Sequence, residues 1–476
     1  MATGAQAQQA TTSTANDIKK TSVTVYNSGF GIVREQRVIK LEKGANLLRY
    51  EDVASTIDPT SISIKSLTQP DALAVREQNY QYDLLTPTSI LNKSVGKKIR
   101  FKRMQGTQSE IIEGTLLNPP TNIINSPDGS QNTYSGLVIR TNDGKIILNP
   151  VGEAILDEVP SGLVARPSLV WLLNAAKSGE QTTEVAYMAN QMQWKADYVA
   201  VVNETDTKMD LTGWVTLDNK SGGTYSNAQL QLIAGDVRRV QEEQPMYPKM
   251  ARGYMTMEAA SAPEFKEESF FEYHLYTLDA PTTIRDNETK QMQLMSAANA
   301  GIKKKLIFDG SRYNFSGGMP GGGAATDEQK AAVVVEIKNE QANNMGVPLP
   351  KGKVRVYKAD QRGNLQFVGE DRIDHTPKDE LVRLYIGDAF DVVGTRKQTS
   401  VNQISDRVNE TSYEITIRNR KETTADVSVV EHFWGDWQIT QKNTPFEKLD
   451  ARSVEFPLTL KKGESKTITF TVRTKW

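Results

Sequence analysis

Short runs that alternate apolar and polar residues recur along almost the whole chain, and this period-two pattern limits the possible folds more than any other feature. Clear examples are VTVYNSGFGIVREQRVIKL (23–41), SISIKSL (61–67) and KTITFTVR (466–473). Successive side chains of a β-strand point to opposite faces of a sheet, so such runs predict half-buried strands. Gly, Pro and Asn separate the runs, and Asp143-Gly144 is a strong hairpin signal. We therefore predict a mainly β protein made of tandem antiparallel β-sandwich domains with little helix.

The spacing of the strand patterns and the glycine content divide the 476 residues into segments. Residues rich in Ala, Thr, Gln and Ser begin the chain, and this composition favours disorder. Seven further strand patterns at sandwich-like spacing follow the Gly-rich stretch SGGMPGGGAATDEQK. The predicted segments are a low-complexity tail (1–20), an N-terminal β domain (21–185) with a small inserted β-barrel (about 88–160), a central β domain (186–315), a Gly-rich linker (316–330) and a C-terminal β-sandwich (331–476).

One stretch, RPSLVWLLNAAKSG (166–179), has the signals of a short connecting helix. Pro167 suits the first helical position and Gly179 suits a helix stop. In a helix Leu169, Leu172 and Leu173 would share one face. We expect a helix here and strands on both sides of it.

Composition and charge remove several classes of function. The chain has 57 basic and 58 acidic residues, a balance that gives no electrostatic signature of a nucleic-acid partner. It has no run of eighteen apolar residues, so we expect no membrane span, and the first 20 residues have no signal-peptide pattern. Cysteine is absent, which favours an extracytoplasmic protein (secreted, at the cell surface or periplasmic) and excludes thiol chemistry and disulfides.

Familiar catalytic and cofactor motifs are missing from the sequence. The glycines of 316–330 are not followed by the Lys and hydroxyl of a phosphate-binding loop, and no G-x-S-x-G elbow occurs. The three histidines, His274, His375 and His432, do not have metal-ligand spacing. We therefore predict no cofactor, no metal and no catalytic residues, and expect that the protein is not an enzyme.

The second half of the chain resembles a known group of proteins. The segments that carry the resemblance are WKADYVAVVNE (194–204), LTGWVTLDNKSGGTYSNAQLQLIAGD (211–236), FFEYHLYTL (270–278) and PLPKGKVRVYKADQRGNLQFVGEDRIDHTPKDELVRLYIGDAFDV (348–392). Over about residues 186–476 the chain is similar to the bacterial mucoidy inhibitor A-like proteins, which have a conserved C-terminal domain of unknown function. The resemblance implies an exported, mostly β protein and no catalytic residues. Those proteins carry a coiled coil before this domain, whereas residues 1–185 lack heptads.

Two groups of residues are candidate binding sites. Glu370, Asp371, Asp374 and His375 lie within GEDRIDHTP, where acids could bind a cation or act as acid and base. In a strand, the side chains of Asp371 and Asp374 would point to opposite faces, because the residues are three apart. They can meet only if the segment after them folds back. Solvated charges at a strand end are the simpler interpretation.

The second candidate site is EHFWGDWQIT, in which His432, Trp434 and Trp437 surround a Gly-Asp turn. Exposed indoles could stack on sugar rings or anchor a protein partner. The alternative is that one indole belongs to the core and the other covers the end of the sandwich.

Open sheets must protect their edge strands, and an unstructured tail can add a strand to a neighbouring copy. We therefore expect a non-enzymatic, extracytoplasmic structural or scaffolding protein that forms a homo-oligomer or polymer, with the N-terminal tail a candidate for donation. The alternatives are a module that binds envelope polysaccharide and a hydrolase that uses Glu370, Asp371 and Asp374.

Overall fold

The computed structural model describes residues 10–105, 108–125, 131–239, 265–309 and 328–476, and these form mainly β structure. About 66% of the chain is strand and 4% is helix, which confirms the predicted mainly β fold. Two compact units are present. Unit 1 consists of residues 1–193, 218–231 and 281–288, and unit 2 consists of residues 194–217, 232–280 and 289–476.

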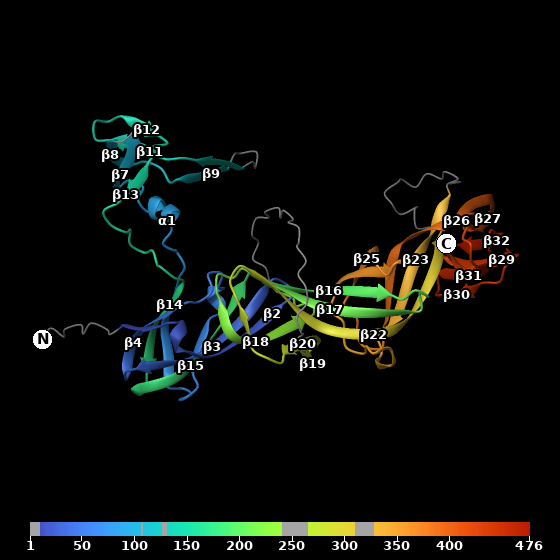
Figure 1. Ribbon diagram of the computed structural model, residues 1–476, viewed down its shortest axis with the longest axis horizontal. Helices are drawn as coiled ribbons and strands as arrows, with labels where there is room; N and C mark the ends of the chain where they lie inside the picture. Colours follow the sequence, from blue (N-terminus) through green and yellow to red (C-terminus); the bar gives the residue numbers. More distant parts are fainter. Residues whose placement is uncertain (1–9, 106–107, 126–130, 240–264, 310–327) are drawn as a thin grey trace. The chain divides into compact units, whose positions relative to one another are not determined.

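Two sheets form the main part of unit 1 (Figure 1). One has the order β1-β4-β14-β6 and the other contains β18-β2-β3-β15-β5, with β21 beside β18. The elements are β1 (Ala10–Ser13), β2 (Ile18–Tyr26), β3 (Phe30–Leu41), β4 (Gly44–Glu51), β5 (Ser63–Ser66), β6 (Leu73–Gln81), β14 (Ser168–Ala175), β15 (Gly179–Asn190), β18 (Tyr225–Ala234), β21 (Thr282–Ile284) and the 3-10 turns η1 (Ala15–Asp17) and η2 (Pro59–Ser61).

The predicted helix at 166–179 is wrong, because Ser168–Ala175 forms strand β14 between β4 and β6. Its burial alternates along the chain, with Leu169, Trp171 and Leu173 fully buried and Leu172 on the other face. The helical face proposed for the three leucines therefore does not exist. Pairing with a strand on each side outweighs the weak local helix signals.

The expectation of disorder over residues 1–20 is wrong for residues 10–20, whereas residues 1–9 lie outside the described residues. Strand β1 pairs in parallel with β4 of the same chain. The fully buried Arg37 explains this order, since its guanidinium donates to the carbonyl oxygens of Ser13 at 3.2 Å and Glu51 at 2.9 Å. The same guanidinium pairs with the buried Glu35 at 2.7 Å. Composition cannot reveal such a partner, which lies more than twenty residues away.

An inserted segment between β6 and β14 contains a short helix, an open sheet and a hairpin. Its elements are α1 (Pro87–Asn92), β7 (Lys98–Gln105), β8 (Gln108–Leu116), β9 (Thr121–Asn125), β10 (Gln131–Ser135), β11 (Val138–Thr141), β12 (Ile146–Leu148) and β13 (Glu153–Ile155). The sheet order is β12-β11-β8-β7-β13, and no sheet of the described residues closes into a barrel. The barrel predicted at 88–160 is therefore an open sheet. In the described residues its two end strands, β12 and β13, have three residues each and lie at opposite ends of the sheet order.

Unit 2 is built on a 13-stranded sheet with the main path β25-β24-β16-β17-β22-β23-β26-β27-β32-β29, to which β28, β30 and β31 are joined. The hairpin β19–β20, whose strand β20 pairs with β18, also belongs to this unit. The elements are β16 (Met192–Val202), β17 (Lys208–Asn219), β19 (Phe265–Phe270), β20 (Tyr273–Leu278), β22 (Glu288–Asp309), β23 (Gln329–Lys338), η3 (Gln341–Asn343), β24 (Gly352–Ala359), β25 (Leu365–Ile373), β26 (Leu381–Ser405), β27 (Val408–Asn419), β28 (Ala425–His432), β29 (Asp436–Lys442), β30 (Glu447–Lys448), β31 (Ser453–Leu460) and β32 (Ser465–Lys475).

The C-terminal strands of unit 2 enclose an aromatic core. Phe456 and Phe470 stack with centroids 5.2 Å apart, and Phe433 meets Phe470 edge-on at 6.0 Å. Ile415 and Val429 are fully buried in the same cluster. Residues 316–327 of the predicted Gly-rich linker lie outside the described residues, and β23 begins at Gln329.

Candidate binding surface

The candidate surface begins where strand β28 ends. Burial along β28 alternates, so that Val427, Val429 and Glu431 face inward and His432 faces outward. The alternation continues past the strand: Phe433 is 5% exposed in the core and Trp434 is 64% exposed. The period-two pattern alone therefore brings Trp434 to the surface.

A glycine turn then redirects the chain into β29. Gly435 has φ = 74°, and a Cβ there would lie 2.5 Å from the carbonyl oxygen of Lys475 on β32. A side chain at this position would thus be both strained and obstructed. Because β29 pairs with β32, with Asp436 opposite Lys475, the turn also brings the backbone of Gly435 next to that of Trp476, a residue that is 61% exposed.

The two tryptophans named in the sequence analysis have different environments. The indole N–H of Trp437 donates to the carbonyl oxygen of Ala451 at 2.8 Å, and its ring lies 5.0 Å from that of Phe433. Trp437 is half-buried, whereas most of Trp434 is exposed to solvent. The first indole holds the turn against the core, and the second keeps most of its surface exposed.

Two cations, which sequence reasoning missed, lie over these rings. The guanidinium carbon of Arg452 is 5.0 Å from the centroid of Trp434, and the ammonium of Lys448 is 4.4 Å from that of Trp437. Both distances fit cation–π contacts. We call Trp434, Trp437, Trp476, Arg452 and Lys448 the aromatic–basic patch. The cations come from the segment between β29 and β31, and the sequence gives no signal that it returns to the tryptophans.

The loop that presents Arg452 is held by its own hydrogen bonds. The carboxylate of Asp450 accepts the backbone N–H of Arg452 at 2.6 Å, and this bond holds the pKa of Asp450 below its ordinary value. The backbone N–H of Phe433 donates to the carbonyl oxygen of Arg452 at 2.8 Å. The backbone beside Trp434 and the backbone that carries its cation are therefore joined directly.

An ion pair with a buried carboxylate lies at the end of β28, three residues before Trp434. Arg396 donates from Nε and Nη2 to the two carboxylate oxygens of Glu431, at 2.8 and 2.9 Å. Burial raises the pKa of Glu431, and the guanidinium of Arg396 opposes that rise. The guanidinium carbon also lies 4.1 Å from the ring centroid of Tyr413. This bidentate pair ties the end of β28 to β26.

His432, the third residue predicted at this site, joins a row of hydrogen-bonding groups. Its Nδ1 is 2.9 Å from Oγ of Ser453, and its Nε2 is 3.3 Å from a carboxylate oxygen of Asp309. These residue types can form a catalytic triad, and their wide separation in sequence hid the arrangement. Ser453, however, is only 6% exposed and lies in strand β31. The row links β22, β28 and β31.

The acidic stretch at 370–375 makes separate interactions along β25. Glu370 pairs with Lys353 at 3.0 Å and with Arg355 at 3.5 Å. Asp371 instead accepts the backbone N–H of Tyr385 at 2.7 Å, which joins β25 to β26. These two carboxylates thus have different partners on different strands.

The remaining two residues of that stretch lie beyond the end of β25. The backbone carbonyl of Asp374 accepts the hydroxyl of Thr376 at 2.8 Å. Nδ1 of His375 accepts the backbone N–H of Lys351 at 3.2 Å. Burial and the Lys351 ammonium lower the pKa of His375. Among the residues that the structure describes, no group of three or more His, Asp or Glu side chains is arranged to hold a metal ion.

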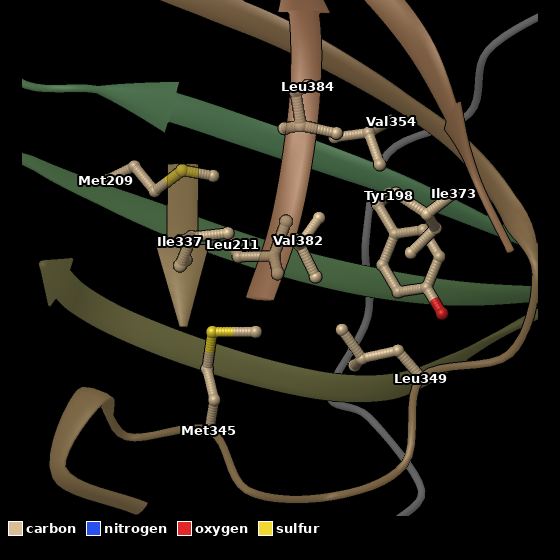
Figure 2. A pocket seen from close by; sticks show the side chains of 10 residues that line it. All are labelled: Tyr198, Met209, Leu211, Ile337, Met345, Leu349, Val354, Ile373, Val382 and Leu384. Atoms are coloured by element: carbon tan, nitrogen blue, oxygen red, sulfur yellow. The ribbon is translucent and has the colours of Figure 1, made fainter. Parts of the chain in front are cut away.

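A small void lies close to the acidic stretch (Figure 2). Ile373 of β25 lines it together with residues such as Met209, Met345 and Leu384, and its walls are almost wholly apolar. The hydroxyl of Tyr198 donates to the carbonyl oxygen of Pro350 at 2.8 Å. The void has a volume of about 10 Å³, near the lower limit for a single water. We interpret it as a packing defect, because none of Glu370, Asp371 and Asp374 lines it.

Fold and surface together define a mainly β, multi-sheet protein with an exposed aromatic–basic patch. The chain belongs to the family described as "Domain of unknown function (DUF4139)", whose model matches residues 183–476 and therefore includes the patch. No curated protein matches the chain. In the described part of the chain, no helix has the length and apolar character needed to cross a membrane.

Proposed function

We propose that this chain is a non-enzymatic, extracytoplasmic structural β protein that associates with copies of itself. The observation that carries the proposal is the aromatic–basic patch, in which Trp434 is 64% exposed beside Arg452 and Trp476 is 61% exposed. Tryptophan and arginine are enriched among the few residues that dominate the energy of protein–protein interfaces. Large exposed apolar groups next to such cations therefore favour a protein partner.

Polysaccharide binding is the second candidate, and Trp434 is the observation that favours it. A sugar ring would stack on the indole face, but the Arg452 guanidinium lies 5.0 Å from the ring centroid and competes for that face. The other ring of the pair, Trp437, is half-buried and holds its own turn. Only part of the pair can therefore serve as a sugar platform.

The sheet edges of unit 2 give further support for self-association. Strand β25 ends the main path of the 13-stranded sheet. Leu365, Phe367 and Val368 on this strand are 56%, 55% and 43% exposed. An end strand with exposed apolar side chains can pair with another chain. Strand β1, in contrast, already pairs with β4, so we do not base self-association on donation of residues 10–13.

Two finer parts of the proposal depend on the sequence. The absence of cysteine supports an extracytoplasmic location. The resemblance of residues 186–476 to the mucoidy inhibitor A-like proteins supports a role at the bacterial envelope. The carboxylate hydrolase receives less support, because Glu370 and Asp371 make ion pairs and backbone hydrogen bonds with separate partners.

The test is the mass of the full chain in solution, measured by light scattering over a wide range of concentration. We expect assemblies larger than the monomer, and we expect Trp434→Ala combined with Trp476→Ala to weaken them. Phe390→Ala is a matched control, since Phe390 is 82% exposed and has Lys330 5.0 Å from its ring centroid. A wild-type chain that stays monomeric throughout would remove the proposal. Retention of the chain on envelope polysaccharide, lost in the double variant, would then support the second candidate.

A further inference from the structure

The hairpin β19–β20 of unit 2 ends in an exposed aromatic tip. Phe270 pairs with Tyr273, which leaves Phe271 and Glu272 as a two-residue turn. Phe270 is 52% exposed and Phe271 is 82% exposed, the highest exposure found for a large apolar residue in the described part of unit 2 together with Phe390. Adjacent exposed phenylalanines at a hairpin end are unfavourable in water unless another surface covers them.

The backbone of this tip is strained in order to carry the ring. Phe271 has φ = 57°, in the left-handed region that bulky residues rarely adopt. In two-residue hairpins this first turn position usually holds glycine, asparagine or aspartate. The sequence therefore keeps an aromatic side chain at a position where glycine would relieve strain. A strained residue at an exposed position is a reason to propose a function for it.

A neighbouring ring fixes the tip in place. A Cβ at Gly235 would lie 2.2 Å from the ring of Tyr273, so that glycine allows the ring to pack directly on the backbone. The ring of Phe271 lies 6.0 Å from that of Tyr273. The exposed phenylalanine thus projects from an anchored hairpin.

The charges around the tip are mainly acidic. Glu272 lies in the turn itself, and Glu268 shares a strand face with Phe270 because the two are two residues apart. Glu267 is paired with His274 at 2.7 Å. Acids beside the phenylalanines disfavour contact with an anionic lipid surface and favour a partner that is both aromatic and basic.

We propose that the Phe270–Phe271 tip of one copy docks on the aromatic–basic patch of a second copy. The patch offers exposed Trp434 and Trp476 for the phenylalanine rings, and Arg452 and Lys448 for Glu268 and Glu272. This inference rests on the proposed function and names the interface that it needs. Because each copy carries one tip and one patch, the contact is heterologous and forms a ring or an open fibre.

The first test is Phe271→Gly in the full chain. Glycine removes the ring and suits φ = 57°, so the variant should keep or raise its melting temperature. We expect light scattering to show monomers under conditions where the wild type assembles. Phe390→Ala is again the control for loss of an exposed ring. Assembly of Phe271→Gly equal to that of the wild type would overturn the tip as the contact, whereas a monomeric wild type would remove the proposed function itself.

The second test identifies the partner of the tip. Phe271→Gly keeps an intact patch, and Trp434→Ala combined with Trp476→Ala keeps an intact tip. We expect each variant alone to be monomeric and a mixture of the two to form one-to-one dimers that do not extend. In addition, Glu272→Lys should weaken assembly by about tenfold or more, and Arg452→Glu in the same chain should restore part of it. A mixture that stays monomeric would show that tip and patch are not partners.

Discussion

Replacing Glu431 with alanine should destabilise unit 2 by about 3–5 kcal/mol, because it leaves a largely buried cation without its anion. The carboxylate is 2% exposed and takes two hydrogen bonds from Arg396, whose side chain is 22% exposed. A domain of 150–250 residues loses about 2–4 °C of melting temperature per kcal/mol, so the melting temperature should fall by roughly 6–20 °C.

The assay is thermal and urea unfolding of the single variants Glu431→Ala and Arg396→Met and of the double variant Glu431→Leu with Arg396→Met. Because the double variant removes both charges, we expect it to lose much less stability than the sum of the single losses. The exposed pair of Glu422 and Lys462 provides the control. Glu422→Ala should change stability by less than about 0.5 kcal/mol.

A loss below about 1 kcal/mol for Glu431→Ala would refute the reasoning, since exposed ion pairs have that size. It would mean that Arg396 turns to solvent when its partner is removed. The ion pair would then not hold the end of β28, and the position of the patch would depend on the aromatic core alone.

The remaining predictions concern the patch and the acidic stretch. Trp437→Ala should lower the melting temperature clearly, because it removes a hydrogen bond to Ala451 and a contact with the core. Trp434→Ala should leave the melting temperature nearly unchanged, since most of this side chain is exposed. Equal effects of the two variants in thermal unfolding would contradict these roles. His375 should make stability depend on pH. Burial and the Lys351 ammonium lower its pKa in the folded state, so the unfolded chain binds the proton more readily and stability falls as the pH drops below about 6.5. Urea titrations between pH 8 and pH 5 should show a smaller loss for His375→Asn, and an identical loss would exclude His375 as a cause.

Local patterning was sufficient to predict the class of fold and to select Trp434 and Trp437 as candidates. Side chains alternate along every strand, so a period-two sequence shows which residues share a face without knowledge of the neighbouring strands. The outward position of Trp434 follows in the same way from the alternation through Glu431 and Phe433. The Gly-Asp turn after Trp434 was visible for the same reason, since turn chemistry is local.

The sequence by itself thus determined that the chain forms strands, which of their faces are apolar and where many of the turns lie. Only the tertiary structure decided which strands pair. Residues 168–175 form strand β14 between β4 and β6, Ser13 of β1 accepts a hydrogen bond from Arg37, and the sheet of the inserted segment is open. It also brought Arg452 and Lys448 over the indoles and gave Trp437 its partner. The physical reason is that periodicity reflects interactions between near neighbours in the chain. Pairing, closure and the charges around a site depend on contacts between residues far apart in the sequence, whose energies appear only when the chain has folded.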